Sequence, residues 1–363
     1  MRVRHWARYL LCVSLYYSGA LLLARSIRRR CGNYRLVILT YHSFSDVVQY
    51  LDMAIFPSLF MKQVQCLGKY FKVQTLSDAL ARHYGTADVR GDSAVVTVDD
   101  GYADNVYPLV KAAKTYGVSA TVFLTTDCID NGQPTTVMWV MLAIHYATTE
   151  LINLPEVGIE NMWIRTRSEK EDAIRRIDCA LKPLTGNQRN EVIKQLIGKS
   201  GAEGLIRKNG EAVMLTWDQV RAMKAEGIEF GAHTLTHPVL SLLDAAGVQH
   251  EIVGSIHRIR EMLGAENVIF AYPYGSDAEV SAEVVEICRR SGATAAVVLG
   301  EGDAPINDFF KIPRLMVTSD RSTTPWGQFS KAIWACELEG LVDVVRKLNV
   351  QLQNRIRTFV SHV

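Results

Sequence analysis

VVTVDDGYADN, residues 95–105, places two adjacent carboxylates, Asp99 and Asp100, at the end of a run of β-branched and apolar residues. Such a run predicts a buried strand, and neighbouring side chains on a strand point to opposite faces of the sheet. The two acids are therefore expected to have different roles, unless one of them only stabilises the Asp-Gly turn that ends the strand.

Short apolar runs alternate with longer amphipathic segments on both sides of this stretch, a pattern that is typical of parallel sheets and barrels. We predict strands at residues 35–41, 94–98, 119–124, 228–232, 268–272, 293–299 and 312–317. Between them, we predict helices at residues 57–70, 104–116, 217–226, 246–263 and 279–291. The expected fold class is therefore α/β, with a parallel sheet or barrel.

Three segments depart from this alternation. Residues 1–33 combine the uncharged run 9–24 with flanking arginines. Residues from about 130 to about 215 are charged and helical in pattern, without a strand signal, which predicts a helical insertion or lid. Residues 336–363 predict one amphipathic helix, so the barrel is expected to comprise residues 34–335.

The N-terminal segment has features of a membrane surface helix. Its uncharged run would form a helix about 24 Å long, shorter than the roughly 30 Å of a hydrocarbon core. An ordinary helix packed on the domain is the alternative. We expect residues 1–30 to contact a membrane, slightly favouring its cytoplasmic face, with anionic headgroups facing Arg25, Arg28, Arg29 and Arg30.

The composition is that of a folded chain, because 48% of the 363 residues are hydrophobic and 21% are charged. The net charge of +2 is small for this length and argues against a nucleic-acid partner. The seven cysteines include no CxxC pair and are odd in number, so neither a disulfide framework nor a zinc knuckle is indicated. The oligomeric state stays open.

Polar residues gather where the predicted strands end, and in a parallel barrel these ends share the face that carries active sites. His233 and His237 directly follow one strand, and a spacing of four residues places both imidazoles on the same side of a turn. With one carboxylate of the acidic pair they would form a His₂-Asp metal site with open positions for water and substrate. Two ordinary structural histidines are the alternative.

The segments TVDDGYADN, GAHTLTHPVLS and FAYPYGS, in this order, resemble the polysaccharide deacetylases of carbohydrate esterase family 4, which include chitooligosaccharide and peptidoglycan N-deacetylases. The resemblance covers roughly residues 35–320, apart from the insertion. It implies a distorted, incomplete (β/α) barrel. It also implies a hydrolase that uses a divalent metal to remove acetyl groups from N-acetylhexosamine units of a polysaccharide or a lipid-linked glycan.

Carried over to this chain, the family motifs make Asp99 the catalytic base, and they make Asp100, His233 and His237 the metal ligands. The backbone N–H of Tyr274 would stabilise the developing oxyanion together with the metal. Zinc is the expected metal, with cobalt, nickel and manganese as alternatives.

Two positions depart from the family pattern. Ala271 occupies the place of the arginine that usually orients the base, and KIPRLMV (311–317) lacks the histidine that usually protonates the leaving amine. However, VILTYHSF (37–44) resembles the first strand of a permuted branch, the poly-N-acetylglucosamine deacetylases of biofilm formation, which supplies the acid histidine. Because first and last strands are neighbours in a closed barrel, we predict His42 as the acid and Arg314 as the residue that orients the base.

Several alternatives stay open. The same barrel could act on another amide or on an O-acetyl ester, and non-haem iron oxygenases also use two histidines and a carboxylate. A catalytically weak sugar-binding or assembly protein of an exopolysaccharide system would be consistent with Ala271. Trp139, Trp217 and Tyr102 could stack on sugar rings, although core packing accounts for each of them more simply.

Overall fold

Strand β3, which precedes the acidic pair, belongs to a parallel sheet of eight strands. The computed structural model describes residues 2–85, 91–209, 213–276, 278–300 and 306–341. The strand order is β1-β10-β9-β8-β7-β4-β3-β2, and a pairing of β1 with β3 closes the sheet into a ring that leaves only β2 outside. The strands are β1 (Leu36–Tyr41), β2 (Lys72–Val73), β3 (Ser93–Val98), β4 (Ala120–Leu124), β7 (Glu229–Ala232), β8 (Ile269–Ala271), β9 (Ala295–Leu299) and β10 (Ile312–Met316).

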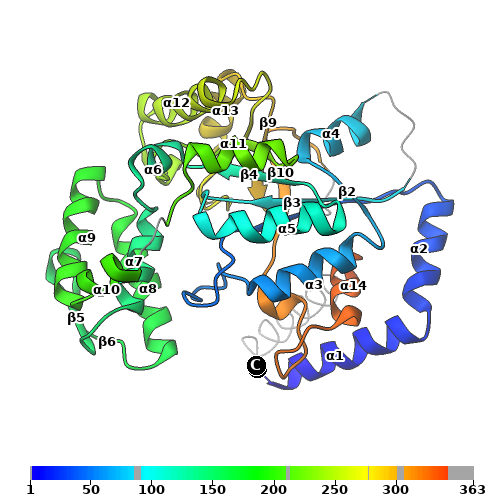
Figure 1. The fold of residues 1–363 in the computed structure, drawn as a ribbon, viewed down its shortest axis with the longest axis horizontal. Coiled ribbons are helices and arrows are strands. Elements are labelled where there is room, and N and C mark those ends of the chain that lie inside the picture. Colours follow the sequence, from blue (N-terminus) through cyan, green and yellow to red (C-terminus); the bar gives the residue numbers. More distant parts are fainter. Residues whose placement is uncertain (1, 86–90, 210–212, 277, 301–305, 342–363) are drawn as a thin grey trace, which may run out of the picture.

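Helices surround this ring (Figure 1). They include α3 (Pro57–Leu67), α4 (Leu76–Tyr84), α5 (Val106–Tyr116), α6 (Thr126–Asn131), α11 (Trp217–Ala225), α12 (Ala245–Leu263) and α13 (Ala282–Arg290). Every strand and helix predicted for the barrel is present, with small differences at the ends. The short strand β2 and the helices α4 and α6 were missed. Thr75 caps α4 by accepting a hydrogen bond from the N–H of Asp78, so a capping signal for this helix was available.

Alternating side chains of the strands fill two cores, as the pleat requires. One core packs between the outer face of the ring and the helices. The other joins alternate residues of the strands, among them Ile38, Val95, Phe123, Ile269 and Ile312. Gly231 on β7 is required by this inner packing, because a Cβ there would lie 2.5 Å from the carbonyl oxygen of Ile269.

The insertion forms a lobe beside the barrel, coloured green in Figure 1. It contains α7 (Thr136–His145), β5 (Leu151–Leu154), β6 (Ile159–Trp163), α8 (Arg167–Leu181), α9 (Gly186–Ser200) and α10 (Glu203–Asn209). The expectation that no strand occurs here is wrong, because β5 and β6 form an antiparallel hairpin. Each of these strands is only four or five residues long, so the alternation that marks them is short.

Three polar contacts dock the lobe on loops of the barrel. Lys182 Nζ lies 3.4 Å from Glu279 Oε1, and Arg167 Nη2 donates to the carbonyl of Gln49 at 2.7 Å. The Tyr50 hydroxyl lies 3.2 Å from His145 Nδ1. The lobe is thereby held against the segments that follow β1 and β8.

The N-terminal segment forms two helices, α1 (Arg2–Tyr17) and α2 (Ala20–Arg30). Gly19, with a φ of 79°, separates them, and they bend by 65°. Within the described residues no single helix is long and apolar enough to cross a membrane, although the bent pair meets those criteria jointly. The ring centres of Trp6 and Tyr9 on α1 lie 5.5 and 5.2 Å from that of Trp326, so α1 packs on the domain.

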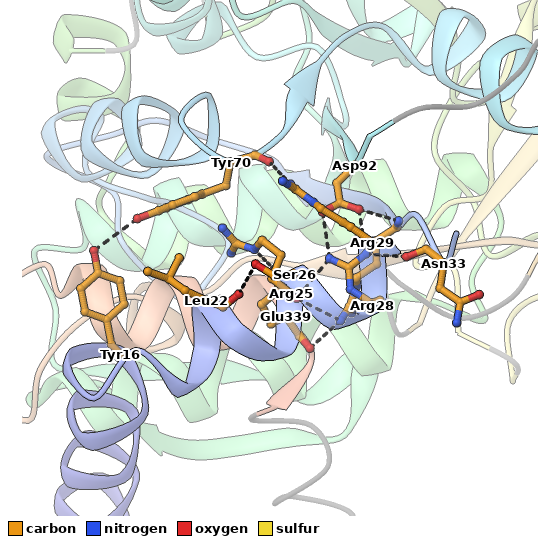
Figure 2. Close-up of polar contacts among 11 residues, drawn as sticks. Tyr16, Leu22, Arg25, Ser26, Arg28, Arg29, Asn33, Tyr70, Asp92 and Glu339 are labelled. Carbon is orange, nitrogen blue, oxygen red and sulfur yellow. Dashed lines mark hydrogen bonds and ion pairs between the residues drawn. The ribbon is translucent and has the colours of Figure 1, made fainter. Parts of the chain in front are cut away.

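Three of the four arginines expected to face headgroups instead pair with acids of the domain, as Figure 2 shows. Arg28 donates to both oxygens of Asp92 at 2.7 and 2.8 Å, and Arg29 Nε donates to Asp92 at 2.8 Å. Arg25 Nε donates to Glu339 at 2.6 Å and is buried. The predicted headgroup contact is wrong for Arg25, which is buried, whereas for Arg28 and Arg29, whose side chains are 19% and 38% exposed, it stays a prediction. Arg30 stays exposed.

The C-terminal helix predicted for residues 336–363 lies almost entirely outside the described residues. Its first residues belong to α14 (Lys331–Leu338), which ends before Gly340. Gly340 has a φ of 69°, a conformation that terminates helices.

Asp92→Ala is expected to lower the free energy of unfolding by about 2–3 kcal/mol, because it removes the partner of two arginines from a buried position. Burial raises the pKa of Asp92, but hydrogen bonds from Arg28, the Arg35 N–H and Arg29 lower it to about 2. The folded pKa lies below the unfolded value, so the contribution is present at neutral pH and is lost as the pH falls towards 2.

Urea denaturation of both proteins between neutral pH and pH 3 measures this contribution. Asp218→Ala is the matched control, because Asp218 is 91% exposed and also pairs with an arginine. Equal stability of the Asp92 variant and the wild type at neutral pH would contradict the prediction.

Candidate metal centre and active site

The chain turns sharply after β3, and this turn orients the acidic pair. Asp99 continues the strand pairing, since its N–H donates to the carbonyl of Tyr41 at 2.9 Å. Asp100 and Gly101 then have φ values of 74° and 82°. A Cβ at residue 101 would lie 2.9 Å from Leu124 Cδ2, so glycine is needed there. We expected strand alternation to point the two carboxylates in different directions. Instead, the geometry of the turn does so.

The Asp99 carboxylate forms a two-pronged ion pair with Arg314 of β10. Arg314 Nη1 and Nη2 donate to the two carboxylate oxygens at 2.7 and 2.8 Å, and Nη1 also donates to Thr97 Oγ1 at 2.9 Å. Both charged side chains are buried. Burial raises the pKa of Asp99, but Arg314 and His233 outweigh this effect and lower it. Asp99 is therefore an ionised acceptor with a fixed orientation.

Asp100 faces the two histidines of the predicted metal site. The Nε2 atoms of His233 and His237 lie 3.4 and 3.2 Å from Asp100 Oδ1, and one ligand atom of each residue lies within 4.8 Å of the others. Neither oxygen of Asp100 has a hydrogen bond of acceptable geometry, although the side chain is buried. A buried carboxylate without a hydrogen-bond donor is costly unless a cation binds it. These three residues fit a divalent metal ion.

A hydrogen bond fixes the orientation of the His233 imidazole, and the backbone of His237 is held by the turn, whereas His237 Nδ1 has no hydrogen-bond partner. His233 Nδ1 lies 2.7 Å from the carbonyl oxygen of Ala271, so a proton on Nδ1 leaves the Nε2 lone pair free to face Asp100. The backbone N–H of His237 donates to Thr234 Oγ1 at 3.0 Å. Ala271, where the family arginine is absent, thus orients the candidate ligand His233 through its backbone.

A pocket of about 230 Å³ collects the predicted residues His42, Asp99, Asp100, His233, His237 and Tyr274. His42 follows β1, and its carbonyl accepts a hydrogen bond from Asn105 Nδ2 at 2.9 Å. The ring centre of Tyr274 lies 5.0 Å from that of His237. Arg314 does not line the pocket and reaches it only through Asp99.

Left-handed backbone concentrates around this pocket. Among the described residues, seven other than glycine have a positive φ, and five of these belong to the pocket or to the turn between its histidines: Leu51, Asp100, Thr234, His237 and Tyr274. Each such residue costs on the order of 1–3 kcal/mol and persists only where the surroundings enforce it. The packing around the strand ends must therefore offset the cost of the left-handed backbone at this site.

The sequence prediction missed two acids of the site. Glu251 on α12 accepts hydrogen bonds from the N–H groups of Leu235 and Thr236 at 2.9 and 3.0 Å and so holds the histidine turn. Glu251 lies among the apolar positions of an amphipathic helix, and an acid at such a position could have indicated a buried hydrogen-bonding role. Asp178 on α8 lines the pocket, and nothing in its local sequence distinguishes it from the other acids of that helix.

Of the three aromatic residues considered for sugar stacking, Tyr102 is buried, and Trp139 and Trp217 are half-buried. Tyr102 is buried, and its hydroxyl lies 2.6 Å from Thr135 Oγ1, so stacking on a sugar is excluded. Trp217 donates from Nε1 to Asp130 at 2.6 Å. Trp139 is half-buried and lies on the lobe.

The sequence matches the polysaccharide deacetylase family over residues 86–296, which is more than half of the chain. The chain therefore belongs to the polysaccharide deacetylase family and is a hydrolase that acts on carbon–nitrogen bonds. A search of curated proteins finds no match.

Solved structures share the fold. The Streptococcus pyogenes deacetylase PplD, solved in complex with acetate, has a TM-score of 0.52 at 17% identity, over 81% of this chain and 96% of that chain. IcaB from Ammonifex degensii has a TM-score of 0.52 at 19% identity, over 83% of this chain and 97% of that chain. With the family match, these similarities confirm the predicted deacetylase-type barrel and are consistent with the permuted branch.

Arg314→Lys is expected to lower kcat by about 10²-fold, because one ammonium group cannot hold both oxygens of Asp99. Metal content should stay at the wild-type level, since Arg314 contacts no residue of the Asp100 cluster in the hydrogen bonds described above. Acetate release and metal analysis measure the two effects. Arg289→Lys, at an exposed pair with Asp308, is the control. An unchanged kcat would contradict an orienting role for Arg314.

Proposed function

We propose that the chain removes N-acetyl groups from N-acetylhexosamine units of a polysaccharide with the help of a divalent metal. Membership of the polysaccharide deacetylase family supports the deacetylation. The observation that carries the metal dependence is the unequal environment of the acidic pair. Asp99 is neutralised by Arg314, whereas Asp100 has no hydrogen-bond donor and faces two imidazole nitrogens.

The residues of the pocket, together with Arg314 behind Asp99, would have separate roles in the reaction. Asp99 accepts the proton of the water that attacks the acetyl carbonyl, and Arg314 keeps its two oxygens in place. A metal ion held by Asp100, His233 and His237, zinc before cobalt, nickel or manganese, would supply a Lewis acid that polarises the carbonyl and lowers the pKa of water.

The leaving amine needs a proton, and His42 is the donor that we propose. Burial lowers the pKa of His42, although the charges of Asp100 and Asp99 oppose this effect. A proton on this imidazole is therefore held less tightly than on an exposed histidine and is more readily given to the amine. The backbone N–H of Tyr274 would donate to the oxyanion. Acetate and a free amino sugar are the products.

Asp99→Asn is expected to abolish turnover while metal content is retained, because the amide cannot accept the proton. Asp100→Ala and His237→Ala should lose both metal and activity. Elemental analysis of the purified proteins and acetate release from N-acetylglucosamine oligomers, with and without chelator, measure these effects. Full activity in any of these variants, or activity that chelation does not reduce, would refute the scheme.

His42→Ala is expected to reduce the rate on an amide substrate about 10²-fold or more, and to reduce it far less on an activated acetate ester. The leaving group of the ester, 4-nitrophenolate, departs as a stable anion and needs no proton. Parallel kcat measurements on an N-acetylglucosamine oligomer and on 4-nitrophenyl acetate make the comparison. Equal losses on the two substrates would show that His42 is not the acid.

We further propose that α1 and α2 attach the enzyme to a membrane surface through apolar contacts. Leu10, Tyr17, Leu22, Leu23 and Ile27 are at least half exposed on these helices. The arginines beside them are largely engaged by Asp92 and Glu339. Burial of leucine side chains, more than attraction to anionic headgroups, is therefore the stabilising term.

Leu22→Glu combined with Leu23→Glu is expected to weaken vesicle binding of the full chain at least about tenfold, since each buried leucine contributes about 1.5–3 kcal/mol. Sedimentation with neutral and anionic vesicles measures the binding. Leu242→Glu is the matched control, because Leu242 is 57% exposed and lies outside these helices. Binding of the double variant at wild-type strength would overturn the proposal.

A further inference from the structure

The lobe carries a groove that the catalytic residues do not use. A cavity of about 590 Å³ lies between the start of α7 and α9, and a second of about 680 Å³ extends from it to α10. Both cavities are lined by Gln133, Pro134, Trp139, Lys194 and Ile197. Because these walls are shared, the two cavities form one extended depression, which we call the lobe groove.

Trp139 is the unusual residue of this groove. The other apolar side chains of α7, from Val137 to Ile144, are buried, whereas Trp139 is half-buried and lines both cavities. Asn131, Gln133 and Asn190 line the same cavity, as do the charged residues Asp127, Arg189 and Lys194. A flat aromatic face beside several amide groups suits a pyranose ring, whose C–H face packs on the indole while its hydroxyls bind the amides.

The lobe groove adjoins the catalytic pocket. Thr136 lines the groove and its neighbour Val137 lines the pocket. Likewise, Thr236 lines the groove and the next residue, His237, lines the pocket. The pocket, at about 230 Å³, is smaller than the roughly 300–1,000 Å³ of sites that enclose a drug-sized ligand. It suits one reacting unit, so the neighbouring units of a chain need another surface.

We propose that the lobe groove binds the sugar units next to the one that is deacetylated, so that the insertion selects oligomers of N-acetylhexosamine over single units. Trp139 is the central contact. The proposal rests on the proposed deacetylase function and names the substrate class as a chain of several units. The lobe is then part of the substrate site and not an accessory domain.

Calorimetric binding of N-acetylglucosamine and its β-1,4- and β-1,6-linked hexamers to the full-length Asp99→Asn chain tests the proposal without turnover. At least one hexamer should bind about tenfold or more tightly than the monomer, and Trp139→Ala in the same background should remove about tenfold of hexamer affinity. Trp163→Ala is the control, because Trp163 is 45% exposed on the same lobe and does not line the groove. This control should keep the hexamer affinity.

Equal affinity for monomer and hexamers, no binding of either, or equal losses in the Trp139 and Trp163 variants would overturn the proposal. Acetate release by the wild-type chain separates this outcome from failure of the proposed function. Acetate release that does not depend on chain length would support the deacetylase function and refute the proposed role of the lobe groove. Length-dependent binding without release from any oligomer would support the groove and refute the reaction.

Discussion

The buried ion pair between Arg314 and Asp99 is the constraint on which the site depends. A guanidinium group with no exposed surface is costly unless a carboxylate and further hydrogen bonds satisfy it. Here Asp99 takes both prongs, Thr97 takes a further bond, and the Phe123 ring lies 5.2 Å from the guanidinium carbon. Strands β3 and β10 must therefore keep their places around β1 for either charge to be tolerated inside the ring.

A second constraint gives the two acids different surroundings. The left-handed backbone at Asp100 turns its carboxylate away from the ion pair and towards the histidines, where no hydrogen-bond donor competes for it. Similar backbone at Thr234 and His237 shapes the opposite side. Glu251 holds that turn by two backbone N–H groups, so the strained loop is stabilised by a helix from which no residue lines the pocket.

The sequence predicted most of the barrel because apolar alternation is a local property, and it predicted the convergence of strand ends because topology imposes it. His42 and Arg314 could be brought together only through the neighbourhood of first and last strands. Other features depend on contacts between distant residues that no local pattern records. Asp92 binds arginines more than 60 residues away, and Asp178 reaches the pocket from an inserted lobe. The direction of the Asp100 side chain was predicted, but its cause was missed, since it follows from a positive backbone dihedral angle and not from strand alternation.

Closure of the sheet through β1 has a consequence for how the protein is recognised. In a closed ring of strands, any strand can come first in the sequence. A circular permutation can therefore change the order of the strands along the chain without changing their arrangement in space. The family match runs from residue 86 to residue 296, and both His42 and Arg314 lie outside it, on either side. The part of the chain that identifies the family is thus different from the parts that carry His42 and Arg314, the residues proposed to assist the reaction.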